Sequence, residues 1–217
     1  MRAVVCGLLL LPFSAYASTL YYGGDWDGIA APIQNEYGGG GINHFDDFDL
    51  SSRSIVTGFF INTFLQSTPA SNYISYTLRR NVQEGNGGEL IAYEEGYALA
   101  TIQATGRSYT SIFGQTYLEY KTTISDLSFN LSPGKYWLQI NLVHSDLSSP
   151  ARMPNSIGSP GQNGLCYAYS VFAWLNYVPR NNDISFGVEG YAVPEPTSLA
   201  ALGLFALLAV RKRKPVN

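Results

Sequence analysis

The sequence has little of the chemistry that disulfides and zinc sites require. Its 217 residues include two cysteines, Cys6 and Cys166, and two histidines, His44 and His144. A zinc site takes about four ligands in a closed geometry, so these residues make a poor zinc set. Once an N-terminal segment containing Cys6 is removed, Cys166 has no partner for an internal disulfide. We expect Cys166 to be a buried thiol that packs as a small apolar residue, with an intermolecular bridge as the alternative.

Charge is scarce as well. Only 13% of the residues are charged and the formal net charge is -3. The sequence shows no basic face of the kind that binds nucleic acid. It also lacks a phosphate loop, a dinucleotide-binding fingerprint and a G-x-S-x-G nucleophile elbow. We therefore expect no cofactor and no nucleic-acid partner.

The sequence contains serine, histidine and acidic residues of the kinds used in hydrolysis, but they form no recognisable catalytic motif. A Ser-His-Asp set can be drawn from His144, Asp146 and a serine, but serine is so common here that the set means little. Glu94 and Glu95 are adjacent, so on a strand they face opposite sides, which argues against their pairing for glycoside hydrolysis. Carboxylates far apart in the sequence stay open as a pair, because such pairing is spatial. The expectation is a protein that is not an enzyme.

The N-terminal stretch MRAVVCGLLLLPFSAYAS has the parts of a secretory signal. Arg2 supplies the positive region, an apolar run follows, and Ala15 and Ala17 have the A-x-A spacing that signal peptidase accepts. The pattern predicts a signal helix over residues 1–17, cut after Ala17 to leave Ser18 as the first mature residue. An uncleaved anchor or a core helix is the alternative.

A second apolar run lies near the other end of the chain. From Thr197 to Val210 there is no charge, and about 14 residues make a helix of roughly 21 Å. A stable membrane span takes about 20 residues, so this transmembrane helix is expected to be a marginal anchor. A basic cluster that stops transfer and stays in the cytoplasm follows at once: Arg211, Lys212, Arg213 and Lys214. The rest of the chain is then expected outside.

Two prolines precede this run. Pro194 and Pro196 fix φ and remove backbone donors, and Pro196 favours an extended Glu195. The stretch VPEPTSLAALGLFALLAVRKRK resembles the PEP-CTERM sorting signal of Gram-negative bacteria. The resemblance implies that Pro194, Glu195 and Pro196, between Val193 and Thr197, are recognised by exosortase, a membrane-embedded cysteine protease or transpeptidase. It also implies a link to exopolysaccharide or biofilm production. A tail anchor that is never processed is the alternative.

Between the two ends, residues 18–193 are predicted to form one all-β domain, an antiparallel β-sandwich or jelly roll. Strands are expected at 20–22, 55–61, 73–80, 135–143, 166–177 and 183–193, with a pair or meander over 90–105 and two pieces within 117–131. Loops are expected up to Gly41 and over 145–164. The phrases FDDFDLSS, LSPGKYWLQI and ISFGVEGYAVPEP resemble domains that precede this sorting signal.

Alternation predicts which side chains of these strands face the core. The expected inward sets are Ile55, Thr57, Phe59 and Ile61; Ile74, Tyr76 and Leu78; Tyr136, Leu138, Ile140 and Leu142; Phe186 and Val188. Lys135, Trp137, Gln139 and Asn141 are expected on a polar outer face. Trp137 is thus the best exposed candidate for stacking on a sugar ring, ahead of Trp26 and Trp174, although core packing is the commoner use of aromatic residues.

The acidic residues offer a candidate for calcium. Carboxylates lie at Asp25 and Asp27, and at Asp46, Asp47 and Asp49, and calcium prefers oxygen ligands of this kind. Their spacing is not that of an EF-hand loop, so we favour the interpretation that they accept backbone hydrogen bonds or cap turns.

These features predict an exported protein with a structural, adhesive or biofilm-matrix role. Its partners would be signal peptidase, exosortase and, as a candidate ligand, exopolysaccharide. The expected location is first an intermediate anchored in the inner membrane, and then the cell envelope, the outer surface or the medium. A glycan-binding module or a glycan-active hydrolase with the same sorting tail is the alternative.

Overall fold

The computed structural model describes residues 17–28, 33–36, 42–66, 73–143, 152–155, 163–170 and 176–194. These residues form strands and connecting segments, and no α-helix is found among them. The strands are β1 (Ser18–Tyr22), β2 (Ile33–Glu36), β3 (Ile42–Leu50), β4 (Ser54–Leu65), β5 (Tyr73–Arg80), β6 (Glu89–Thr110), β7 (Thr116–Ile124), β8 (Phe129–Leu131), β9 (Gly134–Val143), β10 (Arg152–Asn155), β11 (Cys166–Ser170), β12 (Asn176–Arg180) and β13 (Phe186–Ala192).

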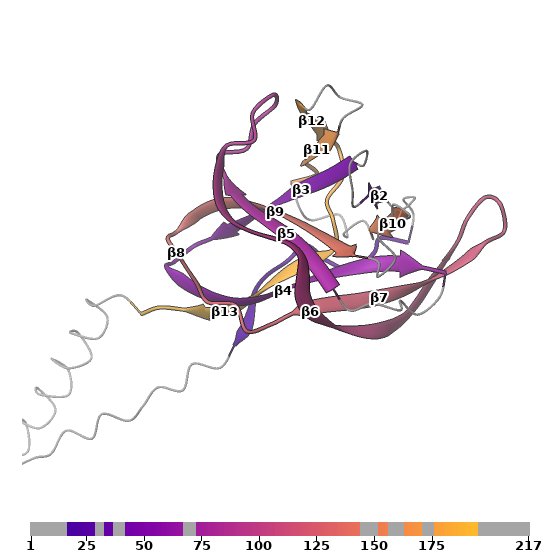
Figure 1. Cartoon of the computed structure of the whole chain (residues 1–217), viewed down its shortest axis with the longest axis horizontal. Helices are drawn as coiled ribbons and strands as arrows, with labels where there is room; N and C mark the ends of the chain where they lie inside the picture. Colours follow the sequence, from indigo (N-terminus) through magenta and orange to yellow (C-terminus); the bar gives the residue numbers. More distant parts are fainter. Residues whose placement is uncertain are drawn as a thin grey trace, which may run out of the picture.

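All strand pairs are antiparallel, and they join into one sheet in the order β1-β13-β4-β7-β6-β5-β9-β3-β11-β12. The long strand β6 connects the two halves. Its first part pairs with β5 from Arg80↔Glu89 to Tyr73↔Leu99, and its second part pairs with β7 from Ala100↔Ile124 onward. Figure 1 shows β6 curving from the side of β5 to the side of β7. The all-β, antiparallel class predicted from the sequence is confirmed, and the sheet is sandwich-like because its two halves face each other.

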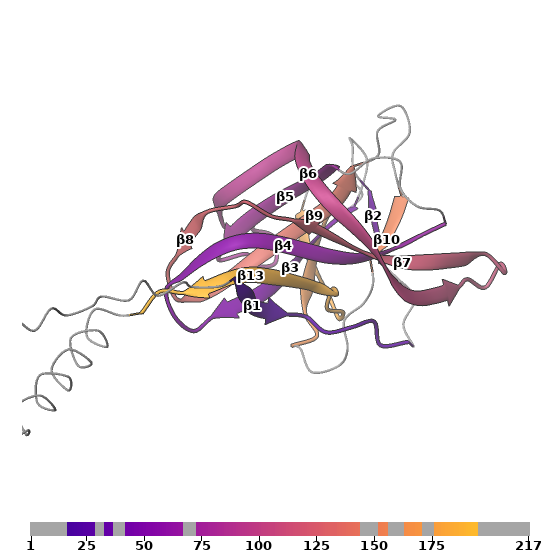
Figure 2. The ribbon, with the colours of Figure 1, turned by 90° about the horizontal axis from the view of Figure 1, so that it is seen from below.

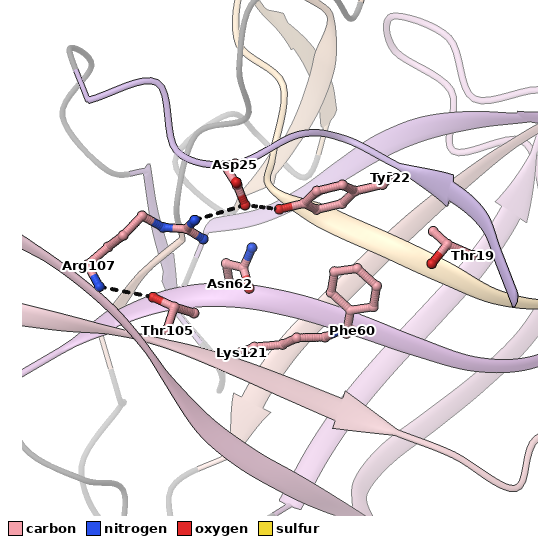
Figure 3. A pocket seen from close by; sticks show the side chains of 8 residues that line it. All are labelled: Thr19, Tyr22, Asp25, Phe60, Asn62, Thr105, Arg107 and Lys121. Carbon is pink, nitrogen blue, oxygen red and sulfur yellow. Dashed lines mark hydrogen bonds and ion pairs between the residues drawn. The ribbon is translucent and has the colours of Figure 1, made fainter.

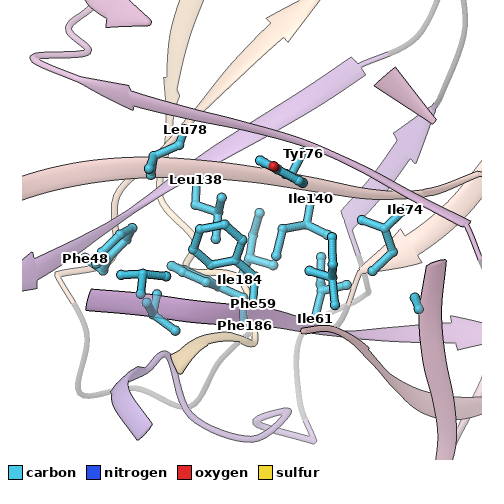
Figure 4. Packing of buried hydrophobic residues seen from close by; sticks show 14 of the residues in the cluster. Phe48, Phe59, Ile61, Ile74, Tyr76, Leu78, Leu138, Ile140, Ile184 and Phe186 are labelled. Carbon is cyan, nitrogen blue, oxygen red and sulfur yellow. The ribbon is translucent and has the colours of Figure 1, made fainter. Parts of the chain in front are cut away.

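The main core fills the space between these halves. Figure 4 shows Phe59 and Phe186 from one half beside Tyr76 and Leu138 from the other. The rings of Phe59 and Tyr76 are 5.6 Å apart, and all four side chains belong to one buried cluster. Burying such aromatic and aliphatic side chains is the main source of stability in a fold of this kind.

The inward faces predicted by alternation are confirmed for β5, β9 and β13. On β4 the prediction is half right. Phe59 and Ile61 are in the core, but Val56 takes the place expected for Ile55 and Thr57. The reason is an irregular register opposite β13, where Val56 pairs with Gly190 and Gly58 with Glu189. Thr57 is the extra residue between these pairs, and such a bulge reverses the alternation on one side of it.

Several predicted boundaries are wrong. Residues 90–105 belong to one continuous strand, β6, and not to a pair of strands. The single strand expected over 166–177 divides into β11 and β12, which pair with each other from Cys166↔Arg180 to Ser170↔Asn176. The expected loops contain β2 and β10, which pair with each other. These short strands contain Pro or lie among glycines, so their local sequence predicts turns instead.

The prediction that the outer face of β9 is exposed to water is wrong for Trp137, Gln139 and Asn141, whereas Lys135 is partly exposed. Trp137, Gln139 and Asn141 are 9%, 8% and 3% exposed. The amide nitrogens of Gln139 and Asn141 donate to Oδ1 of Asn43 on the neighbouring strand β3, at 3.3 and 2.8 Å. Because β9 lies between β5 and β3, these two amide nitrogens are directed at a neighbouring strand and not at water.

The first and last strands lie side by side. Ser18 pairs with Gly190, and Tyr22 with Gly187. Figure 2 shows that β1 begins and β13 ends at the same end of the molecule. The predicted signal helix and transmembrane helix lie outside the described residues. Within the part of the chain that is described, no helix is long and apolar enough to span a membrane.

Candidate functional site

The candidate sorting motif begins where the sheet ends. β13 closes at Ala192, and the backbone N–H of Val193 donates to the carbonyl of Arg53 at 2.8 Å. Pro194 follows and is exposed. Proline has no N–H to continue a strand ladder, so the sequence itself ends the pairing at this point. The recognition residues therefore begin immediately outside the folded sheet.

The predicted signal peptidase site lies beside the end of β13. Ala17 is exposed, and Ser18 opens β1 with its hydroxyl donating to the carbonyl of Gly190 at 3.3 Å. The other predicted residues of the two signals lie outside the described residues: Ala15, Glu195, Pro196, Thr197, Arg211, Lys212, Arg213 and Lys214.

A pocket of roughly 270 Å³ lies on the face of β4, β6 and β7 that points away from the core (Figure 3). β1 and the segment after it cover one side of it. Aromatic, hydroxyl, amide and charged side chains line it together: Thr19, Tyr22, Asp25, Phe60, Asn62, Thr105, Arg107 and Lys121. The outward alternation of Phe60 and Asn62 on β4 puts both side chains on this face, opposite Phe59 and Ile61.

The charges around the pocket are paired. Arg107 Nη1 contacts Asp25 Oδ1 at 2.9 Å, and its Nε donates to the fully buried Glu119. Figure 3 shows the hydroxyl of Tyr22 and the guanidinium of Arg107 both directed at Asp25. Burial and the hydrogen bond to Asp25 raise the pKa of Tyr22. Lys121 Nζ lies 3.6 Å from the centre of the Phe60 ring and 3.8 Å from Glu189 Oε1. The pocket thus offers donors, acceptors and an aromatic wall to a polar ligand.

The acidic residues proposed for calcium lie apart from one another in two groups. Asp25 belongs to the pocket, and Asp27 follows Trp26 after β1. On β3, Asp46 accepts from the backbone N–H groups of Asp47 at 2.9 Å and Ile184 at 2.5 Å. Burial raises the pKa of Asp46 well above its usual range, although these backbone donors oppose the shift.

Asp47 and Asp49 point to the opposite face of β3. Both accept from Lys135, and Asp47 also accepts from Asn163 Nδ2 at 2.6 and 2.8 Å. Within the described ranges, no three or more His, Cys, Asp or Glu side chains are arranged to hold a metal ion. Ammonium, amide and backbone donors occupy the oxygens that calcium would need.

Trp137 is not the exposed sugar platform that alternation predicted. It packs on the outer face of β9 in a second aromatic cluster with Phe45, Val82 and Tyr177. Arg79 lies 5.9 Å from the rings of both Phe45 and Tyr177, so the cluster is closed by a cation. Trp26 is half-buried and packs edge-on against Phe64 at 5.0 Å. Trp174 lies outside the described residues.

Two residues with nucleophilic or acid–base chemistry, Cys166 and His44, are buried. Cys166 is 0% exposed, and burial raises the pKa of its thiol, with Asp46 adding to the effect. His44 is 4% exposed, and burial together with the charge of Arg180 lowers its pKa to about 4. His144 and Asp146 lie outside the described residues, so the Ser-His-Asp arrangement drawn from them stays a prediction.

Sequence patterns did not point to the pocket. Its lining comes from β1, β4, β6 and β7, which are far apart along the chain. The one local signal was the cluster YYGGDWD, which places Tyr22 and Asp25 next to a glycine turn. Arg107 and Lys121 lie in unremarkable strand sequence, so only the pairing of β6 with β7 shows that they share a face.

Residues 192–214 match the family model of the PEP-CTERM protein-sorting motif. No curated protein and no solved structure matches the chain. The match confirms the resemblance seen in the sequence, and it begins at Ala192, the last residue of β13. A motif of this kind implies processing by exosortase. The chain therefore carries a PEP-CTERM protein-sorting motif, which indicates an exported protein that reaches the cell envelope or surface.

Proposed function

We propose that residues 18–193 form an exported, non-enzymatic domain with a structural, adhesive or biofilm-matrix role. Exosortase delivers it through the motif at Pro194, Glu195 and Pro196, after signal peptidase has cut behind Ala17. One observation carries the proposal: the last strand runs directly into the matched motif, with Val193 fixed to Arg53 and Pro194 exposed. A processing enzyme can then bind the motif without unfolding the sheet.

The state of the reactive side chains supports the non-enzymatic part of the proposal. A nucleophilic cysteine acts as its thiolate, and the raised pKa of buried Cys166 keeps that form rare. A histidine base works best with a pKa near the working pH, whereas that of buried His44 is lowered to about 4. The pocket carboxylate of Asp25 and the buried carboxylate of Glu119 beside the pocket are both paired with Arg107.

Localisation in the producing cell tests the sorting step. Glu195→Ala should make the chain accumulate in the membrane fraction, because the motif can no longer be recognised. The matched control Glu189→Ala changes an acidic residue of β13 before the motif and should be sorted like the wild type. Fractionation followed by immunoblotting measures both. Equal distribution of the Glu195 variant and the wild type would remove the basis for the proposal.

The pocket favours a second candidate function, a glycan-binding module. An aromatic wall formed by Tyr22 and Phe60 lies beside the charged groups of Asp25, Arg107 and Lys121. Hydroxyl-rich sugars use both kinds of contact, apolar C–H faces on rings and hydroxyls on polar groups. Tyr22 is 37% exposed, so its ring is accessible at the rim.

Lys121→Met tests this second function. The variant keeps an unbranched side chain over Phe60 and removes the ammonium group. Retardation in a gel containing exopolysaccharide from the producing cell should weaken by about tenfold, the effect of losing one charge-assisted hydrogen bond. Arg53→Met, an exposed basic residue outside the pocket, is the control. Retardation that is unchanged in Lys121→Met would exclude the pocket as a glycan site.

A further inference from the structure

The β6–β7 hairpin extends beyond the rest of the sheet (Figures 1 and 2). Its last pairs are Ser108↔Leu118, Tyr109↔Tyr117 and Thr110↔Thr116. Two backbone hydrogen bonds close the connection. The N–H of Ser111 donates to the carbonyl of Gln115 at 2.8 Å, and the N–H of Gly114 donates to the carbonyl of Ser111 at 2.9 Å. Gly114 has φ of 76°, a left-handed conformation that closes a short hairpin loop. The hairpin tip, residues 111–115, is therefore a defined structure.

Two large apolar side chains occupy the outermost positions of this turn. Ile112 is 91% exposed and Phe113 is 83% exposed. Central turn positions accept most residues and are usually polar, so the backbone does not require these two. They belong to neither of the buried hydrophobic clusters. Their apolar character is unexplained by packing within the described residues and points to a contact outside the chain.

Polarity changes in steps along the hairpin. No charged residue occurs from Ser108 to Leu118. Behind the tip, the rings of Tyr109 and Tyr117 lie 6.2 Å apart across the two strands. The first charges are Arg107 and Glu119, which pair with each other. From the tip inward, the hairpin therefore presents apolar side chains, then tyrosines and hydroxyl groups, and then charges. A bilayer changes in the same order, from acyl chains through the interface to water.

We propose that the hairpin tip inserts Ile112 and Phe113 into the surface of a lipid bilayer, with Tyr109 and Tyr117 at the level of the headgroups. This proposal deepens the proposed adhesive role and rests on it. A bilayer accepts a convex apolar tip without a matching cavity, which a protein partner would have to provide. Because the flanks are uncharged, a neutral bilayer should be sufficient.

The hairpin tip lies far from both ends of the folded domain. The tip lies at the opposite end of the long axis from the point where β1 begins and β13 ends (Figures 1 and 2). A chain held near its sorting motif would therefore present the tip away from its point of attachment. Two inserted side chains bind a membrane only weakly and reversibly. Attachment of the chain at another point would hold the tip near lipid and so raise its effective concentration there.

A tryptophan at the tip reports insertion locally. Phe113→Trp in the full chain is mixed with phosphatidylcholine vesicles that carry bromine on the acyl chains, which quenches tryptophan at that depth. Leu99→Trp is the matched control, because Leu99 is 74% exposed on β6 outside the hairpin tip. The wild-type chain gives the background of the three native tryptophans. Any association through the apolar ends of the sequence is common to all three proteins.

The expected result is quenching and a blue shift of the fluorescence from position 113, with neither at position 99. Ile112→Ser in the Phe113→Trp protein should reduce the quenching, while the unchanged melting temperature of an exposed substitution shows that the fold is intact. Equal behaviour of positions 113 and 99 would overturn the lipid assignment. Adhesion to cells that requires Ile112 and Phe113 but shows no lipid quenching would also overturn it. That result would indicate a protein pocket as the partner. Neither result alters the localisation of Glu195→Ala, so failure of this inference is distinct from failure of the proposed function.

Discussion

Buried ionisable side chains on β3 determine how the stability of this domain responds to pH. His44 and Asp46 lie two positions apart, so they share the face of the strand that points to the core. Burial disfavours the charged form of both, which lowers the pKa of His44 to about 4 and raises that of Asp46. Burial likewise raises the pKa of Asp183, which accepts from the backbone N–H groups of Gly164 and Leu165.

The pH dependence of unfolding tests the state of His44. Between pH 6.5 and about 4 the unfolded chain binds a proton at His44 that the folded chain does not. The contribution of His44 to the free energy of unfolding therefore falls as the pH is lowered through this window, by up to about 3 kcal/mol. Asp46 and Asp183, whose pKa values are raised, act in the opposite direction, so the comparison is made with His44→Gln.

Urea unfolding of both proteins across this pH range supplies the measurement. The stability difference between wild type and His44→Gln should shrink steadily on acidification, because only the wild type loses stability by protonating His44 in the unfolded chain. A difference that stays constant from pH 7 to pH 4 would mean that His44 titrates normally in the fold.

At the scale of the strand, local alternation predicted the core well and the outer faces badly. The inward side chains of β5, β9 and β13 follow from apolar residues at every second position. Trp137 on β9 was assigned to solvent because its neighbours Gln139 and Asn141 are polar, yet a second layer of aromatic residues covers it. That layer comes from β3 and β12 and from Val82 after β5, and no local pattern shows that these segments meet.

The register of β4 and the length of β6 were also not predicted from the sequence. The bulge at Thr57 depends on how β4 pairs with β13, more than a hundred positions away, and it exchanges Ile55 for Val56 in the core. The 22-residue length of β6 has no local signature either, because Gly96 and Gly106 suggest breaks. Instead β6 crosses from one half of the sheet to the other. The hairpin tip was not predicted from the sequence, because nothing local to residues 111–115 shows that Ile112 and Phe113 are exposed.

At the scale of the whole molecule, the arrangement of the ends matches the requirements of sorting. β1 and β13 pair, so the residues that follow the predicted signal cleavage and those that precede the sorting motif lie side by side in the sheet. The predicted tail run and basic cluster need no contact with the sheet to act as an address. This organisation was predictable, because prolines and composition mark the boundary at Pro194. The pocket and the hairpin tip, which we propose as contact sites of the domain, arise only from strand pairing.

We propose that the exported domain loses both of its end segments, the second of them at the sorting motif. The intact mass of the protein isolated from its native producer tests this most directly. We expect a chain that starts at Ser18 and ends near Pro194 to Pro196, together with any group attached in the reaction. A mass of 23.7 kDa, that of all 217 residues, or any chain still ending at Asn217, would contradict it.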